Sequence, residues 1–189
     1  MTPAPVDHDE RRARLTEVLL SVVAESGLEA ASIRTIADRA GVSIGTVQHY
    51  FKSKDEMLRH AYQVVSDDIG RRADERANAA GSWKGAVREI LLELLPLDAR
   101  RTAALRVSIA FAHRAMFSPE LGAKLRADLN ELEEIFTTML REAGVADPER
   151  EAMTLLALNS GLAEPLLFGE GDPQRVVEAL DAHLDRLFS

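Results

Sequence analysis

Apolar residues recur at helical spacing along almost the whole chain, and this periodicity constrains the fold more than any other feature. In the first such segment the apolar positions follow the i, i+3, i+4, i+7, i+8 pattern of one helix face: Leu15, Val18, Leu19, Val22 and Val23. Alternating Val, Ile and Thr runs bounded by turns, which are typical of strands, are absent, while Ala, Leu, Glu and Arg dominate. The sequence therefore predicts an all-α fold.

Capping residues and glycines divide the first third of the chain into four closely spaced helices. The dipeptide Ser26-Gly27 ends the first helix, and Ser32 caps the second. Gly41 ends the second in the left-handed conformation that glycine adopts most easily, and Ser43 caps a short third helix that ends near residue 51. The run Ser53-Lys54-Asp55-Glu56 is a capping-box pattern, so a fourth helix begins there and extends to about residue 75.

Five longer helices are expected in the rest of the chain, which gives about nine in all. Glycines and prolines place them at about 82–95, 99–117, 119–143, 148–168 and 173–188. Pro165 falls inside 148–168 and is expected to kink or split that helix.

The composition excludes several classes of protein. The 189 residues are 46% apolar, enough for a core, and the lack of cysteine excludes disulfides, thiol catalysis and cysteine-bound zinc. No apolar run approaches the roughly 20 residues that span a membrane, and the N-terminus lacks the apolar stretch of a signal peptide. We expect a cytoplasmic protein without a membrane partner.

The net charge of −8 is unevenly distributed. Residues 66–189 hold 15 basic and 22 acidic side chains, whereas residues 32–60 hold five basic and three acidic ones. A sequence-specific DNA-binding protein needs a local basic surface rather than a basic whole chain. The charge pattern is therefore compatible with DNA binding near the N-terminus.

The stretch that carries most of the functional information is GVSIGTVQHYFKSKDEML, residues 41–58. Helix, glycine turn and helix form the helix-turn-helix unit, whose second helix lies in the DNA major groove. Ala37 is small where the two helices cross, and Gly41 permits the turn. With Val47 facing the core, the outward side chains are expected to be Ile44, Thr46, Gln48, His49 and part of Tyr50.

The segment IRTIADRAGVSIGTVQHYFKSKDEML resembles the DNA-binding signature of the TetR family of transcriptional regulators, over roughly residues 11–60. The segment LLPLDARRTAALRVSIAFAHRAMFSPELGAKL and the residues after it resemble the BetI-type ligand domain of that family. The resemblance implies a helix-turn-helix DNA-binding domain over residues 1–53 and an effector-binding and dimerisation domain over residues 54–189. The helix at about 54–75, the only long element joining both parts, would connect them.

The resemblance also assigns the residues that contact DNA. It implies contacts from the start of the second helix, from the recognition helix and, at a backbone phosphate, from Lys54. The complete set is Arg34, Thr35, Ser43, Ile44, Gly45, Thr46, Gln48, His49, Tyr50 and Lys54. Many relatives carry Tyr where this chain has Gln48, and Gln can bond adenine bidentately, so no relative's operator is transferred to this chain.

An effector pocket is expected between the helices of residues 82–168, with Trp83, Phe111, His113, Phe117 and Glu164 as candidate lining residues. Each has a structural alternative. The aromatic rings suit the core at helical spacing, and His113 could pair with a carboxylate. Glu164 lies in an apolar context, where a carboxylate must be paired, solvated or protonated. Aromatic faces hold quaternary ammonium ligands, but only 5% of this chain is aromatic, so choline is not predicted.

Two apolar stripes near the C-terminus are expected to form a homodimer interface, as a four-helix arrangement with their symmetry mates. The stripe on 148–168 has small residues in its middle, which allow another helix to approach closely, and the last helix has a broad apolar face. The candidates are Met153, Ala157, Ser160, Gly161, Val177, Leu180 and Leu184. The alternative is that both stripes face the protomer's own core.

The function predicted from these features is a one-component transcriptional regulator. The family implies a repressor that binds palindromic operator DNA as a homodimer and is released by a small-molecule effector. The rival hypothesis is a helical enzyme or small-molecule carrier. It lacks support, because the chain has no Glu-x-x-His pair, glycine-rich phosphate loop or serine elbow, and its five histidines are scattered. We expect no catalytic residue, metal or cofactor.

Overall fold

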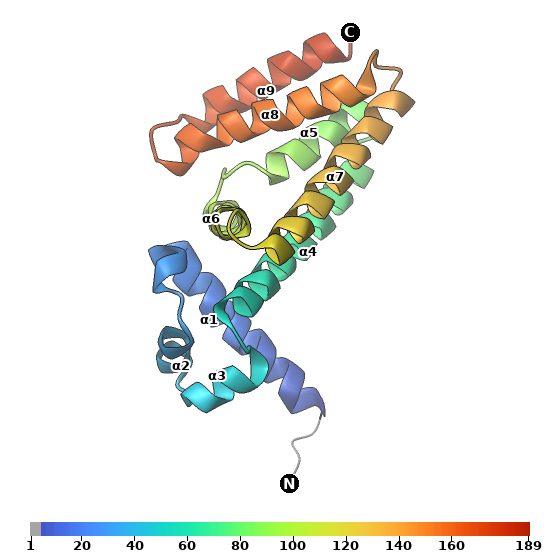
Figure 1. The fold of residues 1–189 in the computed structure, drawn as a ribbon. Helices are drawn as coiled ribbons and strands as arrows, with labels where there is room; N and C mark the ends of the chain where they lie inside the picture. Colours follow the sequence, from blue (N-terminus) through green and yellow to red (C-terminus); the bar gives the residue numbers. More distant parts are fainter. Residues whose placement is uncertain (1–4) are drawn as a thin grey trace. The chain divides into compact units, whose positions relative to one another are not determined.

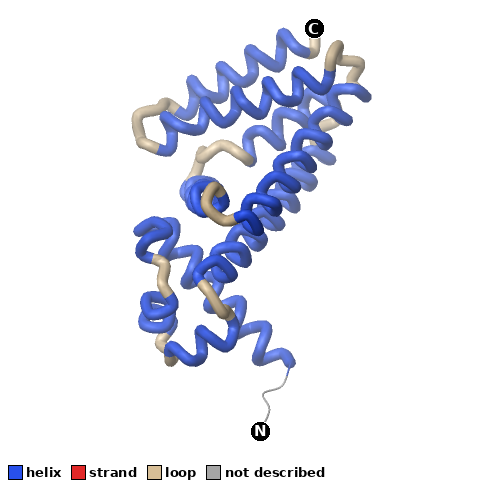
Figure 2. The backbone as a smooth tube through the Cα atoms, viewed as in Figure 1, coloured by secondary structure: helices blue, strands red, loops and turns tan. Residues whose placement is uncertain are grey.

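The computed structural model describes the backbone of residues 5–189 and, of these, the side chains except those of residues 5–7, 9, 28 and 29. All regular elements in this part of the chain are helices, as predicted (Figures 1 and 2). They are α1 (Pro5–Ala30), α2 (Ile33–Ala40), α3 (Ile44–Tyr50), α4 (Lys54–Ala79), α5 (Trp83–Glu93), α6 (Ala99–Ala115), α7 (Pro119–Glu142), α8 (Pro148–Leu167) and α9 (Pro173–Leu187). No helix among the described residues is long and apolar enough to cross a membrane.

The helix boundaries follow the predicted signals closely. Gly27 has a φ of 78° and interrupts α1 near its end, and Gly144, with a φ of 77°, follows α7. Pro165 does not split α8, which continues to Leu167. A proline has no N–H to donate to the carbonyl of Gly161 four residues earlier, but this loss lies near the end of α8 and does not stop the helix there.

The chain forms two compact units. Unit 1 combines the residues up to 66 with residues 106–122, and unit 2 combines residues 67–105 with residues 123–189. The helices α4, α6 and α7 therefore each pass from one unit into the other, so α4 is not the only long element that joins them. The functional boundary predicted after residue 53 differs from this division.

Unit 1 is built around α1 to α3, the first part of α4 and the second half of α6. Its buried side chains include Leu19, Ile36 and Phe51. The ring of Tyr62 on α4 stacks on that of Phe111 on α6, with centroids 4.0 Å apart and planes 4° from parallel. The second half of α6 is thus part of this core.

Unit 2 has its own apolar core, formed by α5, α7, α8, α9 and the later turns of α4. The fully buried side chains in it are Val87, Leu91, Leu95, Phe136, Leu140, Ala152, Leu155, Leu180 and Leu184. Two ion pairs join α5 to α9 beside this core: Arg88 to Asp181, with Nε 2.5 Å from Oδ1, and Lys84 to Asp185. The partners are four residues apart on both helices, so the pairs run along one helix–helix seam.

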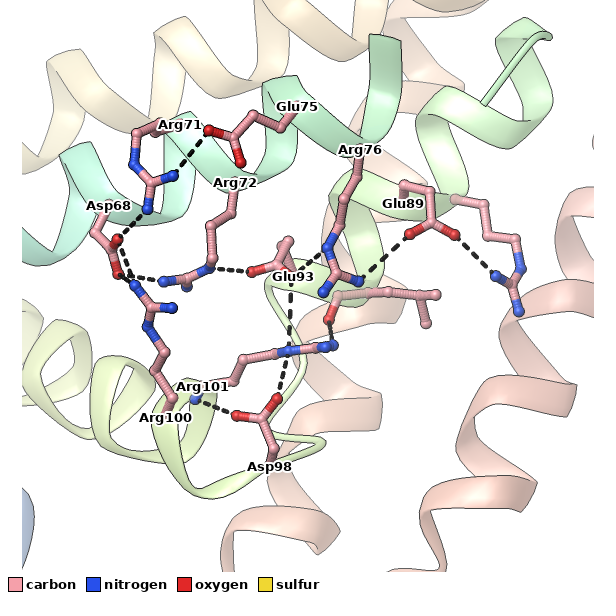
Figure 3. A network of polar contacts seen from close by, with 12 residues as sticks. Asp68, Arg71, Arg72, Glu75, Arg76, Glu89, Glu93, Asp98, Arg100 and Arg101 are labelled. Atoms are coloured by element: carbon pink, nitrogen blue, oxygen red, sulfur yellow. Dashed lines mark hydrogen bonds and ion pairs between the residues drawn. The ribbon is translucent and has the colours of Figure 1, made fainter. Parts of the chain in front are cut away.

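A network of ion pairs joins α4, α5 and α6 within unit 2 (Figure 3). At its centre lies Glu93, whose side chain is only 1% exposed. Its carboxylate oxygens lie 2.7 Å from Nε of Arg72, 3.2 Å from Nε of Arg76 and 3.6 Å from Nε of Arg101. Three helices are therefore held by one buried carboxylate.

A second carboxylate of the network, that of Asp68, also pairs with several arginines. Burial raises the pKa of Asp68. Hydrogen bonds from Arg71 and Arg100 and the nearby charge of Arg72 lower this pKa by more than burial raises it, so the net shift is downward. Because the folded-state pKa lies below the unfolded value of about 4, Asp68 stabilises the fold above that pH. This stabilisation is lost as the pH falls from about 4 through the folded-state pKa.

We predict that Glu93→Gln lowers the free energy of unfolding by about 3–5 kcal/mol, because it removes the buried charge that pairs with the buried Arg72 and with Arg76 and Arg101. The matched control is Glu75→Gln in the same network, since Glu75 pairs with Arg71 but is 63% exposed. The control should change the free energy of unfolding by less than about 1 kcal/mol. Urea denaturation measures both, and equal losses would contradict the central role of Glu93.

Candidate nucleic-acid interface

The N-terminus of α2 is fixed by Ser32. Its Oγ accepts a hydrogen bond of 3.1 Å from the backbone N–H of Thr35 and lies 2.8 Å from the Thr35 hydroxyl oxygen. A serine at this position satisfies a backbone donor that the helix cannot satisfy itself. The exposed Arg34 and half-buried Thr35 therefore lie at an ordered helix start, where backbone N–H groups and the helix dipole favour an anion.

Gly41 makes the turn between α2 and α3. It has φ 66° and ψ 35°, and its N–H donates to the carbonyl of Asp38 while that of Val42 donates to the carbonyl of Ala37. This pair of bonds is the Schellman motif. A residue with a side chain would be strained at this φ, so the glycine fixes the direction in which α3 leaves α2.

Both ends of α3 are held by side chains. Ser43 repeats the Ser32 arrangement: its Oγ accepts from the N–H of Thr46 at 3.1 Å and lies 2.9 Å from the Thr46 hydroxyl oxygen. At the other end, the Lys52 ammonium donates to the carbonyls of Gln48 and His49 at 3.3 and 3.4 Å. A cation is favourable there because the last carbonyls of a helix carry partial negative charge.

The two sides of α3 differ in exposure, as the sequence predicted. Val47 and, just beyond the helix, Phe51 are fully buried in unit 1. The exposed residues are Ser43, Ile44, Gly45, Gln48 and His49, while Thr46 and Tyr50 are half-buried. The outer face thus offers an amide, an imidazole and hydroxyl groups, which can bond base edges and phosphates.

The start of α4, which follows α3 in the chain, carries one basic and two acidic side chains. Lys54 is its first residue and is half-buried. The capping box is modified: Ser53 accepts from the N–H of Glu56, but the Glu56 carboxylate accepts from the N–H of Lys52 at 2.7 Å. The neighbouring carboxylate of Asp55 forms two hydrogen bonds with Arg114, of 2.7 and 3.0 Å. Both acidic groups therefore have partners within unit 1.

Two side chains of α1 that are not among the predicted site residues contact the end of α3. The His8 ring lies 4.5 Å from that of Tyr50, and the Arg12 guanidinium carbon lies 5.7 Å from the centre of the Phe51 ring. The helical spacing of the sequence could have indicated these contacts, because positions 8, 12, 15 and 19 share one face of α1.

The pKa of His60, whose ring centre lies 5.5 Å from that of Phe51, is lowered. The main cause is burial, and the charges of Arg12 and Arg59 add to it.

The five residues expected to line an effector pocket are divided between the two units. Phe111 is fully buried against Tyr62 in unit 1, where exposed His113 and Phe117 contact each other with ring centres 5.7 Å apart. Trp83, which is 47% exposed, and exposed Glu164 belong to unit 2. Phe111 therefore acts as a core residue.

The residues expected at a dimer interface also divide. Met153, Ala157, Ser160 and Gly161 are exposed on α8. Leu180 and Leu184 on α9 are 0% exposed and belong to the core of unit 2, as the alternative interpretation required, and Val177 is half-buried. The predicted face is thus available on α8 but not at the two leucines of α9.

In the part of the chain that the structure describes, no group of three His, Asp or Glu side chains lies close enough together to hold a metal ion.

Both segments that carry the resemblance match family models. Residues 15–61 match the model described as bacterial regulatory proteins, tetR family, and residues 83–189 match that of the BetI-type transcriptional repressor, C-terminal. The chain is 32% identical over 178 residues to the HTH-type transcriptional regulator PksA of Bacillus subtilis (strain 168), covering 92% of this chain and 85% of that protein.

Solved structures agree with this assignment. A transcriptional regulator from Rhodococcus sp. Rha1 has a TM-score of 0.86 at 37% identity, covering 93% of this chain and 95% of that chain. A regulator from Saccharomonospora viridis, solved in complex with choline, has a TM-score of 0.85 at 19% identity, covering 94% and 96%, and supports the fold alone. The family names describe a transcriptional regulator and not an enzyme. The chain belongs to the TetR family of transcriptional regulators and has a BetI-type C-terminal domain.

Proposed function

We propose that the protein is a repressor that binds palindromic operator DNA as a homodimer and is released by a small-molecule effector. The observation that carries this proposal is the outer face of α3, with exposed Ile44, Gln48 and His49 on a helix whose two ends are fixed. Arg34 and Thr35 at the start of α2, and Lys54 at the start of α4, are proposed to hold the DNA backbone.

Two copies of α3 are needed for specificity. With seven residues and a rise of 1.5 Å per residue, α3 is about 10 Å long and spans only a few base pairs. A two-fold dimer would place a second α3 about 34 Å away, in the next turn of the same groove. We propose that the exposed face of α8, with Met153, Ala157, Ser160 and Gly161, forms the interface, since small side chains let two helices approach closely.

The effector is proposed to bind the BetI-type domain, between the helices of residues 82–168. Two separate pairs of exposed residues remain candidates for contact with it: Trp83 and Glu164 in unit 2, and His113 and Phe117 in unit 1. Phe111 is already occupied in the core of unit 1. The choline bound to one structural neighbour is not carried over to this chain, because 19% identity supports the fold alone.

Effector binding must favour a conformation that binds DNA poorly, or it changes nothing. We propose that α4 acts as a lever and that α6 moves with it. The Asp55–Arg114 ion pair and the Tyr62–Phe111 stack join the two helices within unit 1, and both helices continue into unit 2. An unchanged distance between the recognition helices on effector binding would contradict the lever.

We predict different outcomes for Gln48→Ala and Lys54→Ala. The first should relax preference at one base position of each half-site by about 1–3 kcal/mol, because it removes a base contact. The second should weaken all sequences alike and lower the slope of log K against log salt by about one per protomer, because it removes a phosphate contact. Fluorescence anisotropy with operator variants across salt measures both, and identical behaviour of the two variants would contradict these roles.

We predict that Gly161→Glu weakens dimerisation by about 100-fold or more, because it buries an unpaired charge between two copies of α8. The matched control is Gly70→Glu on α4, which adds the same charge to another exposed helical glycine. Both glycines are exposed, and at both an added Cβ meets no atom within 4 Å beyond its chain neighbours and the backbone of its own helix. Sedimentation velocity measures the association, and a dimer that survives Gly161→Glu would show that the interface lies elsewhere.

A further inference from the structure

The helix α1 begins before the part of the chain that the family model covers. That match starts at residue 15, whereas α1 starts at Pro5. The additional turns carry His8 and Arg12, which are four residues apart and therefore share one face of the helix. That face continues into the buried Leu15 and Leu19, while Arg12 is half-buried and His8 is exposed.

These two side chains contact consecutive residues at the end of the recognition helix. The His8 ring lies 4.5 Å from the Tyr50 ring, tilted by 48°, and 5.7 Å from the His49 ring in an edge-to-face arrangement. The His49 and Tyr50 rings are themselves 5.2 Å apart at 90°. One turn further along α1, the guanidinium of Arg12 lies over Phe51. His8, His49 and Tyr50 thus form a cluster of three rings that joins α1 to the last turn of α3.

The last turn of α3 depends on such contacts. A helix of seven residues is not stable by itself, because its nucleation cost is spread over few hydrogen bonds. Val47 is the only buried residue within α3, and it lies in the middle of the helix. After Val47, three kinds of contact hold the helix: the hydrogen bonds from Lys52, the packing of the adjacent buried Phe51, and the ring cluster.

We propose that His8 is a positioning residue for DNA recognition. Its ring holds His49 and Tyr50, and with them the last turn of α3, in the conformation that meets the DNA. His8 acts through these two residues by ring packing, not as a cation on a phosphate. The role in recognition rests on the proposed function of α3, whereas the packing role in the free protein does not.

Three variants of the full-length protein separate packing from charge. His8→Ala removes the ring, His8→Phe keeps a ring without a titratable group, and His8→Lys places a cation there without a ring. The first readout is hydrogen exchange of the amides of residues 47–51 in the absence of DNA. The second is the dissociation constant for a duplex selected by the wild-type protein, with thermal unfolding as the control for the overall fold.

In the free protein, exchange of residues 47–51 should be about 3- to 10-fold faster in His8→Ala and His8→Lys, since this is the contribution of an aromatic contact. His8→Phe should exchange like the wild type. The dissociation constants should follow the same order, with about 3- to 10-fold weaker binding for the Ala and Lys variants. Wild-type exchange in all three variants would overturn the proposal.

Tight DNA binding by His8→Lys together with weak binding by His8→Phe would overturn it in favour of a phosphate contact. If the wild-type protein selects no DNA sequence, the proposed function of α3 fails, and the proposal for recognition fails with it. The exchange measurement still decides whether His8 packs the end of α3, so the two failures are distinguishable.

Discussion

The helix α3, which we propose as the recognition helix, is too short to hold its own conformation, and the rest of unit 1 compensates for this. Seven residues leave most of the helix's backbone groups at an end, where no partner exists within the helix. The hydroxyl of Ser43 satisfies a donor at the start, and the ammonium of Lys52 satisfies acceptors at the end. The buried Val47 then fixes the rotation of the helix, which leaves Gln48 and His49 facing outward. The positions of the groups available to DNA depend on these few contacts.

The helices and the helix-turn-helix could be predicted from the sequence because their signals are local. Ser32, Gly41 and Ser43 each act within a few residues of themselves, so their roles can be assigned without knowledge of the fold. Pro165 shows the limit of this reasoning, because a proline loses one hydrogen bond to the preceding turn but does not by itself end a helix, and α8 continues for two residues beyond it.

The contacts between distant segments could not be predicted. A stripe of apolar residues indicates that a helix has a buried side, but it does not indicate what covers that side. For this reason the sequence predicts Leu180 and Leu184 at a dimer interface, although they lie in the core of unit 2. Phe111 was a candidate for the effector pocket, but its partner Tyr62 is 49 residues earlier in the chain, as its stacking contact shows. The contact of His8 with Tyr50 likewise depends on the fold.

The claim on which this account depends is that the outer face of α3 reads a two-fold symmetric sequence. Selection by the full-length protein from a random duplex library at about 150 mM salt, followed by sequencing, tests it most directly. The account predicts enrichment of a palindrome whose half-sites lie about one helical turn apart. Recovery of duplexes without a shared sequence would contradict it, because the exposed amide and imidazole of α3 would then not be reading bases.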